Sequence, residues 1–310
     1  MPHEDFLNWS YKHQSAHFGI HEQFPDSLVK SWLDEKSADY YRHIRSFEFV
    51  RLIASEYGVS DIGSVKWLTV GDGRLGLDSV RIKKFGFPST FPTDLSPFLL
   101  KKGQEWGVIN EFGIENAEEL SFEDNSFDWT FCKETLHHLP RPYQAIYEFL
   151  RVSRAGVVII EPNDCQFTLN SGLLMRLPTV LRRMIRRLGF TRLLIEQPVW
   201  ENTGNYVYSF NKREYLKIAY GLNLPFIAVK GINDHYVEGC EFEPAEESNS
   251  IFCEIRSTID EKDKMCGWGL RDFDMTIVVF FKETPDISVR KALRSASWDI
   301  IHLQQSPLFD

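Results

Sequence analysis

The chain has 310 residues, with 44 acidic and 35 basic side chains, a formal charge of −9 and 43% hydrophobic residues. This composition is that of an ordinary globular protein and excludes a disordered chain, and the length fits one large α/β domain or two smaller ones. The net acidity argues against a general nucleic-acid-binding protein, which needs a basic face.

No stretch approaches the roughly 20 apolar residues of a membrane span. The N-terminal sequence MPHEDFLNWSYKH has no apolar core of the kind found in signal peptides. The five cysteines are odd in number and include no C-x-x-C pair, which favours reduced thiols over a zinc or disulfide framework. We therefore expect a cytoplasmic protein without a structural metal.

The first predicted elements are helical. Residues 27–58 repeat apolar side chains at helical spacing and end at Gly58. We interpret residues 1–64 as an N-terminal helical extension that precedes the main domain.

From residue 65 to residue 310, β-rich and helical segments alternate. The predicted strands cover 65–70, 89–93, 127–132, 157–160, 226–231 and 275–281. The predicted helices cover 77–85, a segment that begins at Pro97, 142–152 and 212–220. This alternation indicates an α/β fold with a doubly wound, Rossmann-like, mostly parallel sheet.

Two stretches, 163–208 and 233–270, are less regular and are interpreted as insertions. The second is acidic, because residues 233–263 hold ten acids and two bases. The first contains a basic amphipathic segment at 177–188, whose arginines offer contact with an anionic membrane or a diphosphate-bearing substrate. We favour a surface helix that packs on the core or pairs with the acidic insertion.

The first insertion is also a predicted substrate lid, since it follows the strand at 157–160 and so lies at the expected mouth of the site. Trp200, Tyr206 and Tyr208 would supply aromatic walls there, although core packing is the commoner role of such side chains.

A glycine-rich turn follows the first predicted strand in the sequence WLTVGDGRLGLD, residues 67–78. Gly71, Gly73 and Gly76 have the G-x-G-x-x-G spacing, in which a missing Cβ lets a ligand approach the backbone. The spacing fits NAD, FAD or S-adenosylmethionine equally. Asp94, at the end of the next predicted strand, can accept both hydroxyls of a ribose, or it can simply cap the following helix.

A second block of linked motifs narrows the interpretation. Residues 116–152 read NAEELSFEDNSFDWTFCKETLHHLPRPYQAIYEFLRV and continue with SRAGVVIIEP. This block resembles the class I S-adenosylmethionine-dependent methyltransferases, and specifically the methyltransferase type 11-like group. The resemblance covers residues 65–162 in order and spacing, and beyond residue 162 it is only architectural.

The resemblance implies a cofactor site for S-adenosylmethionine. Its glycine loop would surround the amino-acid portion of the cofactor, and Asp94 with the adjacent Leu95 would hold the ribose. Asn116 and Ala117 would meet the adenine edge, and the backbone of Lys133 would line the methionine portion. The residues so assigned are Gly71, Asp72, Gly73, Gly76, Asp94, Leu95, Asn116, Ala117 and Lys133.

The chain departs from the family pattern at two positions. Thr69 stands where the family usually has an acid, two residues before the first glycine, and we expect Asp72 to take over the contact with the cofactor's ammonium group. Asn116 stands where the family usually has Asp, and its amide oxygen can still accept a hydrogen bond from the adenine amino group.

The candidate catalytic residues lie just after the predicted strand at 127–132. If the methyl acceptor is a hydroxyl, Glu134, His137 or His138 is placed to act as its base, although HHLPRP also reads as a plain turn. A metal site is not expected there, because two adjacent histidines should point apart and no third ligand is evident.

Three functional hypotheses follow. The first is a methyltransferase for a small molecule, in particular a sugar, nucleotide-sugar or natural-product hydroxyl, with no nucleic-acid partner and an undetermined oligomeric state. The second is an NAD-dependent oxidoreductase, which would not explain the block at 116–152. The third is a non-catalytic scaffold with a methyltransferase fold, for which the departures at Thr69 and Asn116 leave room.

Overall fold

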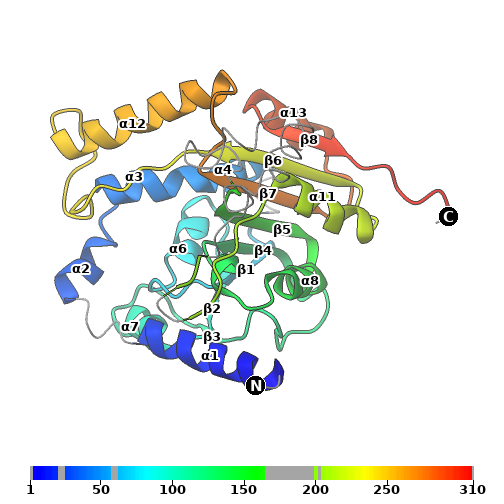
Figure 1. Ribbon diagram of the computed structural model, residues 1–310, viewed down its shortest axis with the longest axis horizontal. Helices are drawn as coiled ribbons and strands as arrows, with labels where there is room; N and C mark the ends of the chain where they lie inside the picture. Colours follow the sequence, from blue (N-terminus) through cyan, green and yellow to red (C-terminus); the bar gives the residue numbers. More distant parts are fainter. Residues whose placement is uncertain (1–2, 20–24, 57–61, 165–198, 202–203, 309–310) are drawn as a thin grey trace, which may run out of the picture.

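An eight-stranded sheet forms the centre of the protein (Figure 1). The structure is a computed structural model that describes residues 3–19, 25–56, 62–164, 199–201 and 204–308. The strand order is β3-β2-β1-β4-β5-β7-β6-β8. The strands are β1 (Lys66–Val70), β2 (Ser89–Asp94), β3 (Gly113–Ile114), β4 (Phe127–Lys133), β5 (Ser153–Pro162), β6 (Phe226–Ile232), β7 (Met275–Phe281) and β8 (Asp299–His302).

Strands β1 to β5 pair in parallel, as the alternation of strands and helices predicts. Strand β7 runs antiparallel to both of its neighbours, β5 and β6, and β8 adds a further antiparallel edge beside β6. The sheet order reverses between β1 and β4, so the carboxyl ends of these strands and of β2 form the crevice where ligands bind in open α/β sheets.

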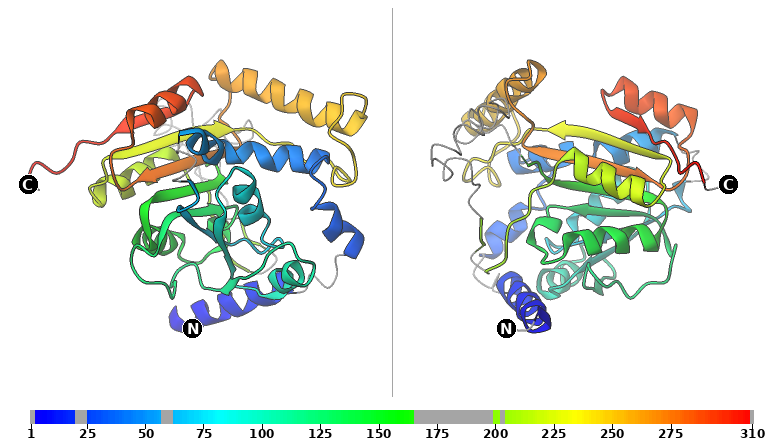
Figure 2. Two further views of the ribbon diagram at one scale, coloured as in Figure 1. Left: turned by 180° about the vertical axis from the view of Figure 1, so that it is seen from behind. Right: turned by 45° about the vertical axis from the view of Figure 1, so that its right-hand side comes forward.

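Helices cover both faces of the sheet (Figures 1 and 2). Those of the first half are α1 (His3–Gly19), α2 (Asp26–Ser31), α3 (Ala38–Ile44), η2 (Arg45–Phe47), α4 (Glu48–Glu56), α6 (Leu77–Lys84) and α7 (Phe98–Glu105). Those that follow are η3 (Leu136–His138), α8 (Pro142–Val152), α11 (Lys212–Gly221), α12 (Ser250–Gly267) and α13 (Ile287–Ser295).

The two faces of β5 explain the layering. Val157 and Ile159 lie in a core cluster with α8 and α11, whereas Val158 and Ile160 lie in a second cluster with α4, α6 and α13. All four side chains are fully buried, as is typical of a central strand that is covered on both faces.

Helix α4 is part of the second cluster and covers the sheet directly. Phe49 of α4 is fully buried and makes edge-on ring contacts with Trp129 of β4 and Phe281 of β7, at centroid distances of 5.3 and 5.9 Å. The N-terminal segment therefore contributes a layer of the hydrophobic core.

Most predicted strands and helices after residue 65 are present within one or two residues, apart from β5, which begins at Ser153 and ends at Pro162. The predicted helix at 142–152 has the predicted bounds. Helix α11 begins after Asn211 with a capping box, in which Asn211 and Glu214 each bond the other's backbone N–H.

The interpretation of 233–270 as irregular is wrong over its second half, which forms the 18-residue helix α12. Its buried face consists of Phe252, Ile255 and Ile259, a stripe too narrow to stand out among the many charges. The segment 27–58 is helical as expected, and α2, α3, η2 and α4 occupy its described part. Gly58 lies outside the described residues, and β3, β8 and α13 were not predicted.

In the part of the chain described above, no helix is both long and apolar enough to cross a membrane. The basic segment 177–188 lies outside the described residues.

We predict that Phe49→Ala lowers the free energy of unfolding by about 3–5 kcal/mol, because it leaves a cavity between α4 and the sheet. Phe242→Ala is the matched control, since Phe242 is 57% exposed, and it should change stability by no more than about 0.5 kcal/mol. Urea unfolding of both variants makes the measurement. Equal stabilities would contradict the assignment of α4 to the core.

Candidate active site

A cavity of about 390 Å³ lies where β1, β2 and β4 end. It is lined from the first half of the chain by Gln14, Ser15, Trp32, His43, Val70, Gly71, Asp72, Gly73, Arg74, Asp78, Arg81, Asp94, Leu95, Ser96 and Leu99. Further along the chain it is lined by Glu115, Asn116, Ala117, Lys133, Glu134, Thr135, His138 and Leu139. Of the nine residues assigned to the cofactor, Gly76 alone is not among these lining residues.

The glycine loop is shaped by close approaches of its backbone. Gly71 has a φ of 76°, and a Cβ there would lie 2.0 Å from Thr135 Oγ1. A Cβ on Gly73 would lie 2.6 Å from Asp94 Oδ2. Gly76 has a φ of 75° at the start of α6. The loop thus requires glycine at each of these turns, for backbone conformation or for room.

Asp72 has a different role from the one expected of it. Its buried carboxylate accepts hydrogen bonds from the Thr69 hydroxyl at 2.8 Å and from the backbone N–H groups of Asp78 and Ser79 at 3.0 and 2.9 Å. Burial, together with the nearby Asp78, raises the pKa of this carboxyl well above its usual range. Asp72 caps the N-terminus of α6, and its oxygens are taken up by that task.

Asp94 ends β2 and faces the loop. Its Oδ1 accepts a hydrogen bond from the Ser96 backbone N–H at 2.7 Å. Burial raises the pKa of this carboxyl to about 6, although hydrogen bonds from backbone N–H groups, including that of Gly73, act to lower it. A carboxylate at this position, beside a backbone without Cβ, suits the two hydroxyls of a ribose.

Asn116 and Ala117 line the cavity next to Asp94, since the N–H of the preceding Glu115 donates to the Asp94 carbonyl oxygen at 3.0 Å. The Asn116 Oδ1 atom accepts a hydrogen bond from the Glu118 backbone N–H at 3.0 Å, which fixes the turn after β3. An amide oxygen has a second lone pair, so it can also accept from an adenine amino group.

Helix α1 covers the cavity and is tied down by polar contacts. Gln14 donates to the carbonyl oxygen of His138, and Tyr11 donates to the buried Glu118 at 2.5 Å. Ser10 donates to Asn205 at 2.9 Å. In Figure 2 this helix runs beside α7, at the far side of the molecule from α12.

The two candidate histidines lie in η3, with ring centroids 3.9 Å apart, so the expectation that they point apart is wrong. The Nδ1 atom of His137 lies 2.7 Å from Glu161, and the His138 ring hydrogen-bonds Glu201. Burial disfavours the His137 imidazolium, yet the hydrogen bond to Glu161 and the negative charges of Glu161, Glu134 and Glu201 together raise the pKa of His137. His138 lines the cavity, whereas His137 does not.

At the end of β4, Lys133 and Glu134 form an ion pair on the cavity wall. Lys133 Nζ also lies 3.1 Å from the Nδ1 atom of His43 of α3. Burial and the adjacent Lys133 lower the pKa of His43 to about 3, and the Lys133 charge lowers that of Glu134 to about 2. At neutral pH His43 is therefore neutral and Glu134 is ionised.

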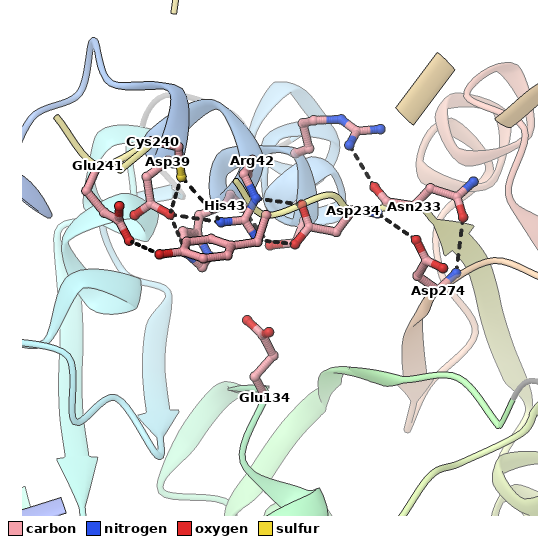
Figure 3. Close-up of polar contacts among 12 residues, drawn as sticks. Asp39, Arg42, His43, Glu134, Asn233, Asp234, Cys240, Glu241 and Asp274 are labelled. Atoms are coloured by element: carbon pink, nitrogen blue, oxygen red, sulfur yellow. Dashed lines mark hydrogen bonds and ion pairs between the residues drawn. The ribbon is translucent and has the colours of Figure 1, made fainter. Parts of the chain in front are cut away.

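Figure 3 shows a further polar cluster around α3. Asp39, Cys240 and Glu241 bring three potential metal ligands within 4.8 Å of one another. Asp39 already pairs with Arg42 at 3.1 Å and with Arg74 at 2.9 Å. Because those two guanidinium groups neutralise Asp39, its chemistry favours a structural ion-pair cluster over a cation site.

The three aromatic residues expected at the lid do not line the cavity. Trp200 and Tyr206 face each other at 6.0 Å in a bridged pair, and Tyr208 lies 4.9 Å from Tyr206. Tyr208 nevertheless bonds the loop that carries the histidines, since its N–H donates to the His137 carbonyl at 3.2 Å. Residues 165–198 of the predicted lid lie outside the described residues.

Sequence reasoning missed the residues contributed by the N-terminal helices, namely Gln14, Trp32 and His43, and also Arg74 of the loop. Only Arg74 carried a signal, because a cation next to the second glycine of a cofactor loop is a candidate ligand. Glu161 lies in the quoted block SRAGVVIIEP but was assigned no role there, and Glu201, the partner of His138, belongs to no motif.

The fold and this site resemble a class I methyltransferase domain, in which a glycine loop after β1 and an acid after β2 frame the cofactor. Residues 68–160, less than a third of the chain, match the family described as "Methyltransferase domain". That match favours S-adenosylmethionine over NAD as the ligand of the glycine loop. The two glycine approaches and the Asp94 carboxylate fit that cofactor.

Among known proteins, the chain is 32% identical over 111 residues to 2-methyl-6-phytyl-1,4-hydroquinone methyltransferase of Synechocystis sp., which covers 33% of this chain and 35% of that protein. The chain thus spans about a third of the length of this relative. The structure of the PH0226 protein from Pyrococcus horikoshii aligns with 16% sequence identity and a TM-score of 0.47. The alignment covers 85% of this chain and 98% of that protein. The structure of a SAM dependent methyltransferase from Archaeoglobus fulgidus aligns with 15% sequence identity and a TM-score of 0.42. The alignment covers 70% of this chain and 86% of that protein.

We predict that Gly73→Ala weakens the binding of S-adenosylhomocysteine by about tenfold or more, because the new methyl group displaces the Asp94 carboxylate. Gly63→Ala is the control, since a Cβ at Gly63 meets no atom within 4 Å. Calorimetric titration measures both affinities. Unchanged affinity in Gly73→Ala would contradict the placement of the ribose against Asp94.

We also predict that binding of 5′-methylthioadenosine depends on pH through Asp94. The carboxyl has a pKa of about 6 in the free protein, so it is ionised at pH 7 and mostly protonated at pH 5. A protonated carboxyl loses an acceptor for the ribose, and affinity at pH 5 should be about tenfold lower than at pH 7. Asp94→Asn should bind weakly at both values, and a flat profile for the unaltered protein would refute the role.

Proposed function

We propose that the chain is an S-adenosylmethionine-dependent methyltransferase that acts on a hydroxyl of a small molecule in the cytoplasm. The observation that carries this proposal is the pairing of His138 with Glu201 on the wall of the cofactor cavity. S-Adenosylmethionine supplies an electrophilic methyl group when it is bound. The remaining requirement is an acceptor oxygen that is held in line and relieved of its proton.

His138 is suited to receive that proton. Glu201 accepts from its Nδ1–H, which selects the tautomer with the lone pair on Nε2. Two further contacts orient the loop, since Gln14 and Asn205 both donate to the His138 carbonyl oxygen. A histidine held in this way is the base that we infer, and His137 is a positioning residue held by Glu161.

The size and cover of the cavity support a small acceptor. A volume of about 390 Å³ lies within the range of small-molecule sites. Helix α1 closes one side of the cavity through Gln14 and Ser15. A polymer would need an open groove instead, so we propose a metabolite.

Two acceptor classes follow from separate observations. The arginine-rich segment 171–195 and the polar cavity wall favour a sugar or nucleotide-sugar hydroxyl. The similarity to a protein named as a hydroquinone methyltransferase favours a phenolic natural product. Trp200, Tyr206 and Tyr208 lie next to the His138 loop but outside the cavity lining, so neither acceptor is assigned a contact with their rings.

The experiment is a transfer assay with methyl-labelled S-adenosylmethionine and a panel of monosaccharides, nucleotide-sugars, simple phenols and hydroquinones. We expect label to appear in one class and S-adenosylhomocysteine to form in equal amount. Cofactor binding without transfer to any acceptor would favour the scaffold hypothesis. Failure of S-adenosylmethionine to bind would overturn the proposal.

On the acceptor found in this way, we predict that His138→Gln lowers kcat by about 10²–10⁴-fold, since it removes the proton acceptor. Its affinity for S-adenosylhomocysteine should stay within about twofold, because the other cavity contacts remain. His235→Gln, at a histidine outside the cavity lining, is the matched control and should leave kcat unchanged. An equal effect of both substitutions would refute the assignment of His138.

A further inference from the structure

The amino-acid portion of S-adenosylmethionine carries an ammonium and a carboxylate, and each needs an opposite charge in the cavity. The family's usual acid is replaced by Thr69, and the expected substitute, Asp72, caps α6 with its buried oxygens. The residue that takes the ammonium must therefore lie elsewhere. This question rests on the proposed function, because it assumes that this cofactor binds.

Four other carboxylates line the cavity, and each of them contacts a protein group. Asp78 pairs with an arginine at 3.1 Å, and Asp94 accepts from its own loop while facing the ribose position. Glu115 accepts two hydrogen bonds from one serine in its own loop. Glu134 is paired with the neighbouring Lys133, but its side chain remains 39% exposed on the cavity wall.

The backbone holds Glu134 in an unusual conformation. Its φ is 51°, in the left-handed region that is costly for a residue other than glycine, and its N–H donates to the Ile160 carbonyl at 2.8 Å. Figure 3 shows the carboxylate rising from the loop after β4 toward α3. This turn brings an ionised oxygen pair to the end of the strand that lines the methionine portion.

A matching cation lies near Glu134, in the glycine loop, since Arg74 and Lys133 both contact the ring of His43. Arg74 follows Gly73, lines the cavity and stacks on Trp32 at 4.3 Å. Two of its nitrogens contact His43 at 2.8 Å and Asp39 at 2.9 Å. Its Nε atom is buried and has no hydrogen-bond partner within the described part of the chain. An orphaned buried donor of this kind is costly unless a ligand satisfies it.

We propose that Glu134 binds the ammonium and Arg74 binds the carboxylate of the cofactor's amino-acid portion. The two residues lie on different walls of one cavity, at the end of β4 and in the loop after β1. Lys133 holds the Glu134 carboxylate in place from one side. The arrangement makes the cavity selective for an adenosine ligand that carries a complete zwitterionic amino acid.

Ligand truncation separates this role from a general effect on the fold. S-Adenosylhomocysteine has the amino-acid portion, and 5′-methylthioadenosine lacks it. Glu134→Gln should lower the affinity for S-adenosylhomocysteine by about tenfold or more and change the affinity for 5′-methylthioadenosine by no more than about twofold. Glu134→Asp should retain part of the affinity for S-adenosylhomocysteine. Asp94→Asn, the contrasting control, should weaken both ligands. Calorimetry gives the affinities, and thermal unfolding verifies that each variant is folded.

Arg74 is tested with decarboxylated S-adenosylmethionine, which keeps the ammonium and lacks the carboxylate. The affinity of the unaltered protein for this ligand should be about tenfold or more lower than its affinity for S-adenosylmethionine. Arg74→Gln should remove that difference in affinity. Arg74→Lys preserves the positive charge, so Asp39 keeps an ion-pair partner and this variant can be used if Arg74→Gln does not fold. Arg74→Lys should retain part of the preference for the ligand that carries the carboxylate.

Several outcomes overturn the inference. They are an equal loss of both ligands in Glu134→Gln, unchanged S-adenosylhomocysteine affinity in that variant, and persistence of the carboxylate preference in Arg74→Gln. In each of these cases the unaltered protein still binds the cofactor and the proposed function stands. If the unaltered protein binds none of these ligands, both the inference and the proposed function fail.

Discussion

The buried carboxylate of Asp72 is the contact on which the cofactor cavity depends. It joins the end of β1, through Thr69, to the first backbone N–H groups of α6, so strand, loop and helix are fixed to one another. The loop between them keeps the shape in which two glycines approach Thr135 and Asp94. Because Asp72 accepts hydrogen bonds from the first free N–H groups of α6, the loop rather than the helix N-terminus is left to bind the ligand.

The rest of the site is assembled around this fixed loop from segments far apart in the sequence. Strand ends of the methyltransferase domain supply Asp94, Lys133 and Glu134, whereas the N-terminal helices supply Gln14 and His43. Helix α4 anchors that N-terminal segment in the core through Phe49 and its aromatic neighbours. The covering helices and the sheet therefore form one continuous structure, and the cavity has walls from both.

The parts that the sequence predicted well are those encoded by local patterns. The strand at 157–160, the helix at 142–152 and the spacing of the three glycines each follow from neighbouring residues. The contact between His43 and Lys133 joins residues 90 positions apart, and no local pattern encodes it. The role of Asp72 was likewise hidden, because a carboxylate in a loop can face either a ligand or a helix end, and only the backbone path decides.

The tether of α1 has a consequence for how the cavity opens. Gln14 of α1 donates to the carbonyl oxygen of His138, so the helix that covers the cavity also holds the loop with the cavity-lining histidine. If α1 were lifted to admit or release a nucleoside, that hydrogen bond would be lost, and Asn205 and Glu201 would remain as partners of His138. Cover of the cavity and alignment of the histidine loop are therefore coupled through one side chain.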